Sequence, residues 1–312
     1  MKIFVTGGAG FLGQELVRNL VAGGHGVDHP TSSQCNLMQG GALTNYSKIK
    51  YDRIFHLAAW TQAGDFCLRH PGEQWVYNQL INTNLISWWR TEQPEAKLIC
   101  MGTSCAYPVN MELQEANYMT GEPIESLYTY AMTKRMLYQG VRAMERQYQM
   151  KWLCAVPSTL YGPGYHTDGR QMHFIFDLIR KILRGKYLGE QVTLWGNGHQ
   201  RRELVHVRSF VRVLLDLADN VENRLLNIGA GEDHSIREFA DHICRLVEFD
   251  PDQIRYDTTK YVGAESKILS IGEIRKLVPD YGSRLISLEA GLKETIDWFL
   301  AEKAFLELNE RD

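Results

Sequence analysis

Residues 2–24 read KIFVTGGAGFLGQELVRNLVAGG, and this stretch decides the fold. It opens with an apolar run that suits a buried parallel strand and closes with a segment of helical periodicity that stops at a glycine pair. Between them lie three glycines that let the backbone approach a pyrophosphate: Gly7, Gly10 and Gly13. The N-terminus of the following helix favours the negative charge of a phosphate. A tight turn without a ligand is the competing interpretation, but a strand, a glycine turn and a helix in this order favour a dinucleotide site.

Apolar runs and helical patterns continue to alternate through the first half of the chain. We expect strands within 51–59, 96–108 and 151–164, and helices at 78–89 and 128–150. Such alternation predicts an α/β protein with a doubly wound parallel sheet, the Rossmann fold. The looser pattern beyond these segments predicts a smaller C-terminal α/β lobe that binds the substrate. Sites in such sheets lie beyond the carboxyl ends of the strands.

The segment 102–134 follows one of these strand ends and is rich in reactive side chains. Thr103 and Cys105 come directly after the strand, and Tyr130 and Lys134 lie four residues apart, on one face of the next helix. A free tyrosine has a pKa of about 10, so we expect the lysine cation and a bound cofactor to lower the pKa of the phenol. Tyr130 then exchanges a proton with an oxygen at a carbon that gains or loses hydride, while Thr103 hydrogen-bonds to that oxygen. An exposed Tyr/Lys helix face is the alternative, which the glycine-rich opening disfavours.

The choice of cofactor stays open between NAD and NADP. A carboxylate at the end of the second strand would hold a ribose hydroxyl, whereas an arginine there would hold the extra phosphate. Asp28 is a candidate carboxylate, but Pro30 breaks the expected strand end, and no arginine stands beside Ser32 and Ser33. The expected cofactor contacts come from the glycine turn, two strand ends and the Tyr/Lys pair: Gly7, Gly10, Phe11, Leu12, Gly13, Leu57, Ala58, Ala59, Tyr130, Lys134 and Pro157.

Other polar residues have two interpretations each. Asn78, Asn82 and Asn84 lie in an apolar helix, where they either line the cofactor site or cap and face solvent. His173 opens a later amphipathic helix, where a lone histidine is more often structural than catalytic. Arg201 and Arg202 either hold an acidic substrate group such as phosphate or belong to a solvated turn.

Two local patterns mark the second half of the chain. Residues 192–207 resemble a hairpin that turns at Gly196–Gly198, next to Trp195, and leads into a strand. Ser235 stands three residues before Glu238, the spacing of a helix capping box.

The composition excludes several functional classes. With 312 residues, 44% hydrophobic and 23% charged, the chain is typical of a soluble globular protein. Its net charge of −3 gives no basis for nucleic-acid binding, and no apolar run reaches the roughly 18–20 residues of a membrane span. Met1 leads directly into the first strand, so no signal peptide is expected. The six cysteines contain no Cys-x-x-Cys pair and indicate free thiols in a cytoplasmic protein, with neither disulfides nor a metal site.

These motifs together resemble the extended short-chain dehydrogenase/reductases, a superfamily of nucleotide-sugar epimerases, dehydratases and reductases. The resemblance spans nearly the whole chain and is carried by GGAGFLG (7–13), HLAA (56–59), GTSCAYP (102–108), YAMTK (130–134), LYGPG (160–164), RRELVHV (201–207) and NIGAGEDHSIRE (227–238). It implies a dinucleotide-binding Rossmann domain of residues 1–161 with about 203–226. It also implies a nucleotide-sugar-binding lobe of residues 162–202 with 227–312.

Within this superfamily the chain is similar to the GDP-L-fucose synthase family, which acts as a 3,5-epimerase and 4-reductase on a GDP-4-keto-6-deoxy sugar. The similarity implies that Cys105 and His173 act as base and acid at the carbons beside the 4-ketone. Cys105 must then resemble a thiolate, which needs a cationic neighbour or a dipole, while His173 donates from a pKa near 6.5. It further implies that Tyr130 protonates the oxygen at C4, and that Trp195, Arg202 and Lys267 bind the substrate, with Arg202 on its diphosphate and Lys267 near its nucleotide. The family's proteins pair into homodimers through two long helices, here near 78–93 and 130–148.

Departures from that family leave the substrate open. Pro30 stands in the region where the family has an arginine, Thr159 replaces an asparagine, and the late loop KYVGAESK (260–267) keeps Gly263 and Lys267 without the usual prolines and arginine. A GDP-heptose-like substrate therefore fits as well as a deoxyhexose. A 4-dehydrogenase, 4-reductase or 4-epimerase that performs no 3,5-epimerisation is the second hypothesis, and a catalytically silent dinucleotide-binding protein is the third.

Overall fold

The computed structural model describes residues 1–260 and 265–306. Its centre is a six-stranded parallel sheet with the strand order β2-β1-β3-β4-β5-β10. The strands are β1 (Lys2–Thr6), β2 (Gly26–Asp28), β3 (Arg53–His56), β4 (Lys97–Met101), β5 (Trp152–Pro157) and β10 (Arg224–Ile228). The chain leaves β1 for β2 on one side and returns to β3 on the other. The predicted Rossmann fold is confirmed, and its switch point lies at the end of β1.

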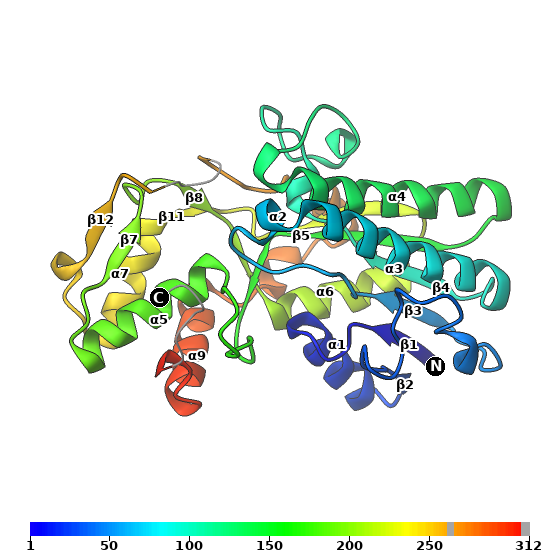
Figure 1. Cartoon of the computed structure of the whole chain (residues 1–312), viewed down its shortest axis with the longest axis horizontal. Helices are drawn as coiled ribbons and strands as arrows, with labels where there is room; N and C mark the ends of the chain where they lie inside the picture. The colour runs from blue at the N-terminus through cyan, green and yellow to red at the C-terminus, as the bar shows by residue number, and fades with distance from the viewer. Residues whose placement is uncertain (261–264, 307–312) are drawn as a thin grey trace.

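Helices cover both faces of the sheet (Figure 1). One face carries α3 (Pro71–Glu92) and α4 (Tyr128–Tyr148), and the other carries α1 (Phe11–Ala22), α6 (Val207–Asn220) and α8 (Gly272–Leu277). The strands alternate their side chains between the two cores, as a pleated strand must. In β1, Phe4 packs under α3, whereas Ile3 and Val5 pack against α1 and α6. Both faces are therefore apolar, which explains the uninterrupted hydrophobic runs of the sequence.

A second, smaller lobe has its own hydrophobic core. That core joins α5 (Phe174–Leu188), α7 (Ile236–Val247) and α9 (Leu288–Ala301). The capping box predicted at Ser235 and Glu238 is confirmed at the start of α7. Short strand pairs complete the structure: β6 (Thr159–Tyr161) with β9 (Leu204–His206), β7 (Thr193–Trp195) with β12 (Arg255–Asp257), and β8 (Arg201–Arg202) with β11 (His234–Ser235). The short helix α2 (Phe66–Arg69) precedes α3.

The expected hairpin within 192–207 is wrong. Trp195 at the end of β7 pairs with Asp257, whereas Arg202 in β8 pairs with His234, so the two strands have different partners. Gly196 and Gly198 both adopt a φ of 77°, a left-handed conformation that turns the chain between the strands. Each strand therefore finds its partner far away in the sequence, which a local pattern could not indicate.

Candidate active site

The glycine turn forms a narrow cradle in which two of the glycine positions have no room for a side chain. Gly7 has a φ of 72°, and a Cβ there would lie 2.8 Å from the backbone nitrogen of Ala58. A Cβ on Gly13 would lie 2.1 Å from the carbonyl oxygen of Gly7. Gly10 caps α1 without a side-chain hydrogen bond, and the first turn of α1 contains no acidic residue. The N-terminus of α1 therefore keeps its positive dipole end for an anion, and the turn fits the pyrophosphate of NAD or NADP.

The loop after β3 closes the other side of this cradle and is held by a buried polar network. The amide of Ala58 donates to Oγ1 of Thr6 at 3.2 Å, and that hydroxyl contacts Nδ1 of His56 at 2.8 Å. Nε2 of His56 contacts Oδ1 of Asn82 at 3.0 Å. Burial lowers the pKa of His56 to about 4, so its imidazole is neutral at neutral pH. The network positions Leu57 and Ala58 beside the glycine turn.

The three helical asparagines neither face solvent freely nor cap a helix. Asn78 binds the backbone of Trp60 through both its amide oxygen and its amide nitrogen, at 2.9 and 3.0 Å. Asn82 contacts His56, and Asn84 donates to the carbonyl of Leu37 at 2.7 Å. All three therefore hold the loops beside the cradle in place.

The carboxylate of Asp28 is already engaged at the end of β2. Its Oδ2 accepts a hydrogen bond from the hydroxyl of Tyr51 at 2.6 Å and lies 2.9 Å from Nζ of Lys2. Burial acts to raise the pKa of Asp28, but these two partners outweigh it and lower the pKa, so the group is ionised. The pairing leaves the choice between NAD and NADP open.

Thr103 and Cys105 lie in the turn that follows β4. The side chain of Thr103 accepts the backbone N–H of Cys105 at 3.2 Å, and the amide of Thr103 donates to the phenol oxygen of Tyr118. Thr103 is buried, whereas Cys105 is partly accessible. The turn therefore presents the thiol at the carboxyl end of the sheet, the edge at which the sequence predicts the site.

Tyr130 and Lys134 share one face of α4, as their spacing predicts, and Nζ of Lys134 lies 5.9 Å from the centre of the Tyr130 ring. Lys134 alone does not lower the pKa of Tyr130 in this structure. Burial raises the pKa of the phenol, the neighbouring Cys105 and Cys67 raise it further, and the hydrogen bond with Thr103 offsets only part of this. Tyr130 is therefore a protonated phenol, a form ready to donate a proton. Burial also lowers the pKa of Lys134.

Lys267 contacts Cys105, the candidate base. Its Nζ is 2.9 Å from Sγ of Cys105, across 162 positions of sequence. Burial acts to raise the pKa of Cys105, but the charge and hydrogen bond of Lys267, with hydrogen bonds from Thr103 and Ser104, lower it overall. The family resemblance implied a place near the nucleotide for Lys267. Its role at the thiol had no local signal in the sequence. Gly263, from the same loop, lies outside the described residues.

His173 caps the N-terminus of α5, beside Tyr165, at a ring-to-ring distance of 6.2 Å. Its surface is solvent-exposed, yet the surrounding protein lowers its pKa to about 4 by desolvation, and the charges of His166 and Lys267 add to this effect. The surroundings thus lower the pKa of His173 from the unperturbed value near 6.5 named in the sequence prediction, and the imidazole in this structure is neutral. Lys267 contacts Cys105, and its charge acts to lower the pKa of both Cys105 and His173.

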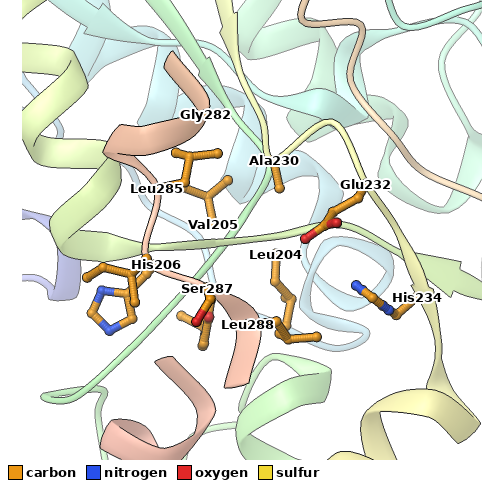
Figure 2. A pocket seen from close by; sticks show the side chains of 12 residues that line it. Leu204, Val205, His206, Ala230, Glu232, His234, Gly282, Leu285, Ser287 and Leu288 are labelled. Carbon is orange, nitrogen blue, oxygen red and sulfur yellow. The ribbon is translucent and has the colours of Figure 1, made fainter. Parts of the chain in front are cut away.

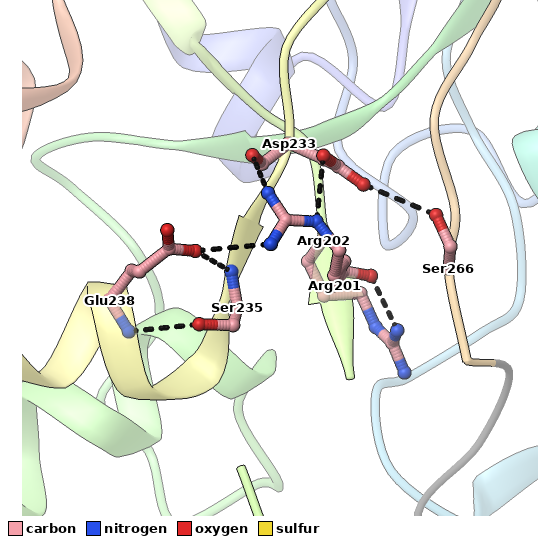
Figure 3. Close-up of polar contacts among 6 residues, drawn as sticks. All are labelled: Arg201, Arg202, Asp233, Ser235, Glu238 and Ser266. Atoms are coloured by element: carbon pink, nitrogen blue, oxygen red, sulfur yellow. Dashed lines mark hydrogen bonds and ion pairs between the residues drawn. The ribbon is translucent and has the colours of Figure 1, made fainter. Parts of the chain in front are cut away.

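The two neighbouring arginines differ in their surroundings (Figure 3). Arg201 forms ion pairs with Asp233 at 3.0 Å and Glu238 at 3.3 Å, so it is part of the framework. Arg202 donates to the carbonyl of Arg201 at 2.7 Å and is partly exposed. Trp195 at the end of β7 exposes 55% of its surface, a large apolar area available to a ligand.

A separate cavity of about 290 Å³ lies between β9 and the start of α9 (Figure 2). Its lining includes His206, Glu232, His234 and Ser287, and none of the residues predicted for the site. The candidate site is therefore distinct from this cavity. Within 1–260 and 265–306, no group of three or more His, Cys, Asp or Glu is placed to hold a metal ion. In the same part of the chain, no helix combines the length and apolar character needed to cross a membrane.

Comparisons with known proteins agree with this geometry. The model of the NAD dependent epimerase/dehydratase family matches residues 3–229. The chain is 27% identical to GDP-L-colitose synthase of Yersinia pseudotuberculosis, over 97% of this chain and 99% of that protein. A GDP-L-fucose synthetase from Naegleria fowleri shares its fold with a TM-score of 0.85 at 22% identity, covering 97% of this chain and 94% of that one. A GDP-mannoheptose C4 reductase from Campylobacter jejuni, solved with NADP bound, has a TM-score of 0.82 at 22% identity over 96% and 98% of the two chains.

Proposed function

This chain belongs to the NAD dependent epimerase/dehydratase family, and we propose that it is an NAD- or NADP-dependent 3,5-epimerase and 4-reductase of a GDP-4-keto sugar. The substrate class is a GDP-4-keto-6-deoxyhexose or a GDP-heptose-like sugar. Relatives named for GDP-L-colitose, GDP-L-fucose and GDP-mannoheptose support a GDP-sugar. The cradle at Gly7 and Gly13 supports the dinucleotide.

The contact between Cys105 and Lys267 is the observation that carries the epimerase part of the proposal. A reductase needs a hydride donor, which is the nicotinamide cofactor, and an acid at the oxygen, which is Tyr130. It has no need of a thiolate. Lys267 Nζ, 2.9 Å from Sγ, favours the ionised form of Cys105. A thiolate beside the reduction site suits the removal of a proton from carbon next to a ketone.

The proposed reaction begins with proton transfer at C3 or C5. The C–H bond breaks, an S–H bond forms on Cys105, and the electron pair moves into an enolate whose oxygen is that of the 4-ketone. The enolate is negative, so it favours the protonated form of the nearby His173 and raises the pKa of that imidazole from its resting value. His173 takes up a proton from solvent as its pKa rises and then gives that proton to carbon on the opposite face, which inverts the centre. His173 is then neutral again, and Cys105 releases its proton to solvent.

Reduction at C4 follows on the same ketone. The reduced nicotinamide cofactor, when bound, supplies the hydride. Tyr130, which rests as a protonated phenol, gives its proton to the oxygen at C4. Thr103 hydrogen-bonds to that oxygen, and Lys134 lies on the same helix face as Tyr130. We assign the cofactor to the glycine turn together with Phe11, Leu12, Leu57, Ala58, Ala59 and Pro157.

We assign the sugar nucleotide to the second lobe. Its separate core, which runs from Tyr161 to Ala304, supports the predicted division into two domains. The exposed ring of Trp195 is suited to stacking, and the guanidinium of Arg202 is suited to the diphosphate. The six cysteines are free thiols, which supports a cytoplasmic location.

A 4-reductase that leaves C3 and C5 untouched is the alternative. The fold similarity to a GDP-mannoheptose C4 reductase favours it. In that case Cys105 and His173 contact the substrate but move no proton. A catalytically silent protein is a weaker alternative, because Tyr130 and Lys134 are both present on one helix face.

The test is proton NMR of GDP-4-keto-6-deoxymannose incubated with the enzyme in deuterated water, first with NADPH and then with NADH. We expect the C3 and C5 proton signals to disappear and C4 to be reduced with one of the two cofactors. Cys105→Ser should abolish exchange at carbon and spare reduction. Reduction without exchange in the wild type would favour the plain 4-reductase. If the enzyme gives neither exchange at carbon nor oxidation of the cofactor, this substrate is rejected. The corresponding GDP-4-keto-heptose would then be tested in the same way.

A further inference from the structure

We propose that Lys267 is the positioning residue that holds Cys105 as a thiolate in the resting enzyme, before any substrate arrives. The importance of that thiolate for catalysis depends on the proposed function, in which Cys105 is the base. The ionisation itself is a property of the unliganded protein and can be measured without substrate. The starting point is the distance of 2.9 Å between Nζ of Lys267 and Sγ of Cys105.

The segment that carries Lys267 is anchored immediately before it. The carbonyl of Glu265 accepts the backbone N–H of Arg201 at 2.7 Å. The hydroxyl of Ser266 donates to Oδ2 of Asp233 at 3.2 Å, and Asp233 is the ion-pair partner of Arg201 (Figure 3). Lys267 therefore follows directly on two tethered residues.

The same segment is anchored immediately after Lys267. The amide of Leu269 donates to Oε2 of Glu203 at 3.0 Å, and Leu269 is buried. The amide of Ser270 donates to the carbonyl of Leu113, while Nδ2 of Asn227 donates to the carbonyl of Ser270 at 3.0 Å. Because the backbone is fixed on both sides, the ammonium group reaches Cys105 from a defined position. Lys267 therefore loses less conformational entropy on contacting Cys105 than a lysine on a free loop would.

Among the described residues that influence the pKa of Cys105, Lys267 is the cation. Thr103 and Ser104 supply neutral hydrogen bonds. Tyr130 and Cys67 are the other titratable neighbours, and burial raises the pKa of both, so both stay protonated and neutral. Desolvation opposes ionisation of Cys105. Without the ammonium group, the neutral hydrogen bonds would have to offset this burial unaided, and the thiol would be the stable form.

The ammonium group of Lys267 also acts on His173, the second proton-transfer group. The charge of Lys267 and that of His166 both act to lower the pKa of His173. The resting site therefore contains a thiolate and a neutral imidazole, two groups that can each accept a proton. The thiolate is therefore ready to accept a proton from carbon, whereas the imidazole takes up its proton only after the negative enolate has formed.

The experiment measures the rate at which iodoacetamide alkylates Cys105 as a function of pH, with the modified peptide identified by mass spectrometry. The thiolate is the reacting form, so the inflection of the rate reports its pKa. We expect the wild-type inflection to lie below the ordinary cysteine value of about 8.5. Lys267→Met should move it above that value and slow alkylation at pH 7 about tenfold or more, because the ionised fraction falls. Lys267→Arg keeps a cation at the position and should preserve a low inflection.

Controls separate this role from a merely structural one. Lys276→Met removes an exposed lysine that pairs with Glu273, and it should leave the inflection unchanged. Thiolate absorbance near 240 nm, measured as the difference between wild type and Cys105→Ser at pH 7, tests ionisation without any change at Lys267. The imidazole C–H signals of His173 should titrate at higher pH in Lys267→Met than in the wild type.

An unchanged inflection in Lys267→Met, or no thiolate absorbance in the wild type, would overturn the proposal. Either result can occur while exchange at C3 and C5 still proceeds, in which case the proposed function stands and Lys267 has another role. Conversely, a shifted inflection in an enzyme that performs no exchange would support the thiolate and reject the epimerase.

Discussion

The carboxylate of Glu203 accepts the backbone amide of Leu269 at 3.0 Å, across 66 positions of sequence. Its other oxygen accepts the amide of Gly231 at 2.7 Å, and only 2% of the residue is exposed. Glu203 thus joins β8 and β9 to the loop after β10 and to the segment that carries Lys267. A buried carboxylate that holds backbone groups in this way makes the geometry of the site depend on its charge.

The first prediction concerns the pH dependence of stability. Burial raises the pKa of Glu203 to about 7, although its backbone donors act to lower it. The pKa of Glu203 in the folded protein lies above its unfolded value. Its stabilising contribution to the free energy of unfolding, roughly 3 kcal/mol, is therefore complete below about pH 4.5 and is lost as pH rises through about 7. Glu203→Gln cannot ionise. The free energy of unfolding of the variant, relative to wild type, should therefore rise between pH 5 and pH 8 in urea titrations.

The matched control is Glu232→Gln, which removes an exposed carboxylate from the same loop region and leaves the backbone contacts of Glu203 intact, so it should not reproduce the effect of Glu203→Gln. Parallel stability curves for Glu203→Gln and wild type across this range would show that Glu203 keeps an ordinary pKa.

The second prediction tests the cofactor cradle. Gly13→Ala places a methyl group 2.1 Å from the carbonyl oxygen of Gly7, where the backbone must shift to make room. We expect NAD(P) affinity to fall at least tenfold and the free energy of unfolding to fall by about 1–3 kcal/mol. Gly40→Ala is the control, because a Cβ there meets nothing within 4 Å. Fluorescence titration with NADPH and with NADH measures both variants and also identifies the preferred cofactor. Unaltered affinity in Gly13→Ala would place the cofactor elsewhere.

Local patterns in the sequence predicted the parts of this structure that local physics determines. The glycine turn between β1 and α1, the capping box at Ser235 and the common face of Tyr130 and Lys134 each depend on residues within one turn of one another. The alternation of strands and helices was enough for the sheet, because each strand is apolar on both faces. Such features need no knowledge of what lies across the molecule.

The features that sequence reasoning missed depend on distant segments. Lys267 contacts Cys105 across 162 positions, and β7 pairs with β12 and not with β8. The sequence predicts that Lys134 and a bound cofactor together lower the pKa of Tyr130, yet in this structure burial and the two nearby thiols raise it. Likewise, a free histidine has a pKa near 6.5, but its surroundings bring that of His173 to about 4. Burial and long-range charge decide these values, and neither can be read from neighbouring residues.

The third prediction separates the two halves of the proposed reaction. Tyr130→Phe removes the proton donor for the oxygen at C4 and keeps the ring, so reduction should slow by about 10²–10⁴-fold. Exchange at C3 and C5 should continue, because Cys105 and His173 are intact. In wild type, the raised pKa of Tyr130 keeps the phenol protonated, so reduction should show no loss from this group up to pH 9. Stopped-flow oxidation of the cofactor and NMR exchange measure the two steps. Equal losses in both would show that Tyr130 also acts in epimerisation.

The last prediction concerns the outer faces of α3 and α4, which expose apolar side chains although the inner faces of both helices pack on the sheet. Trp75, Val76 and Leu80 of α3 and Met136 of α4 are each at least 40% exposed. Exposed apolar residues gathered on two adjacent helices indicate a protein interface. We propose that a second copy of this chain covers them, so that the two α3/α4 pairs form a four-helix contact, as the family resemblance implies. Light scattering of the wild type should therefore give twice 35.8 kDa.

Leu80→Glu combined with Met136→Glu should give a monomer, because a charge buried in an apolar interface is strongly destabilising. Leu188→Glu changes a similarly exposed leucine on α5 and should leave the mass of the assembly unchanged. α3 also carries Asn78 and Asn82, and α4 carries Tyr130 and Lys134, so the interface would support the helices that position the site. The monomeric variant should accordingly unfold at a lower temperature and bind cofactor more weakly. A wild type that is already monomeric at micromolar concentration would leave these apolar faces without a partner and refute the proposed dimer.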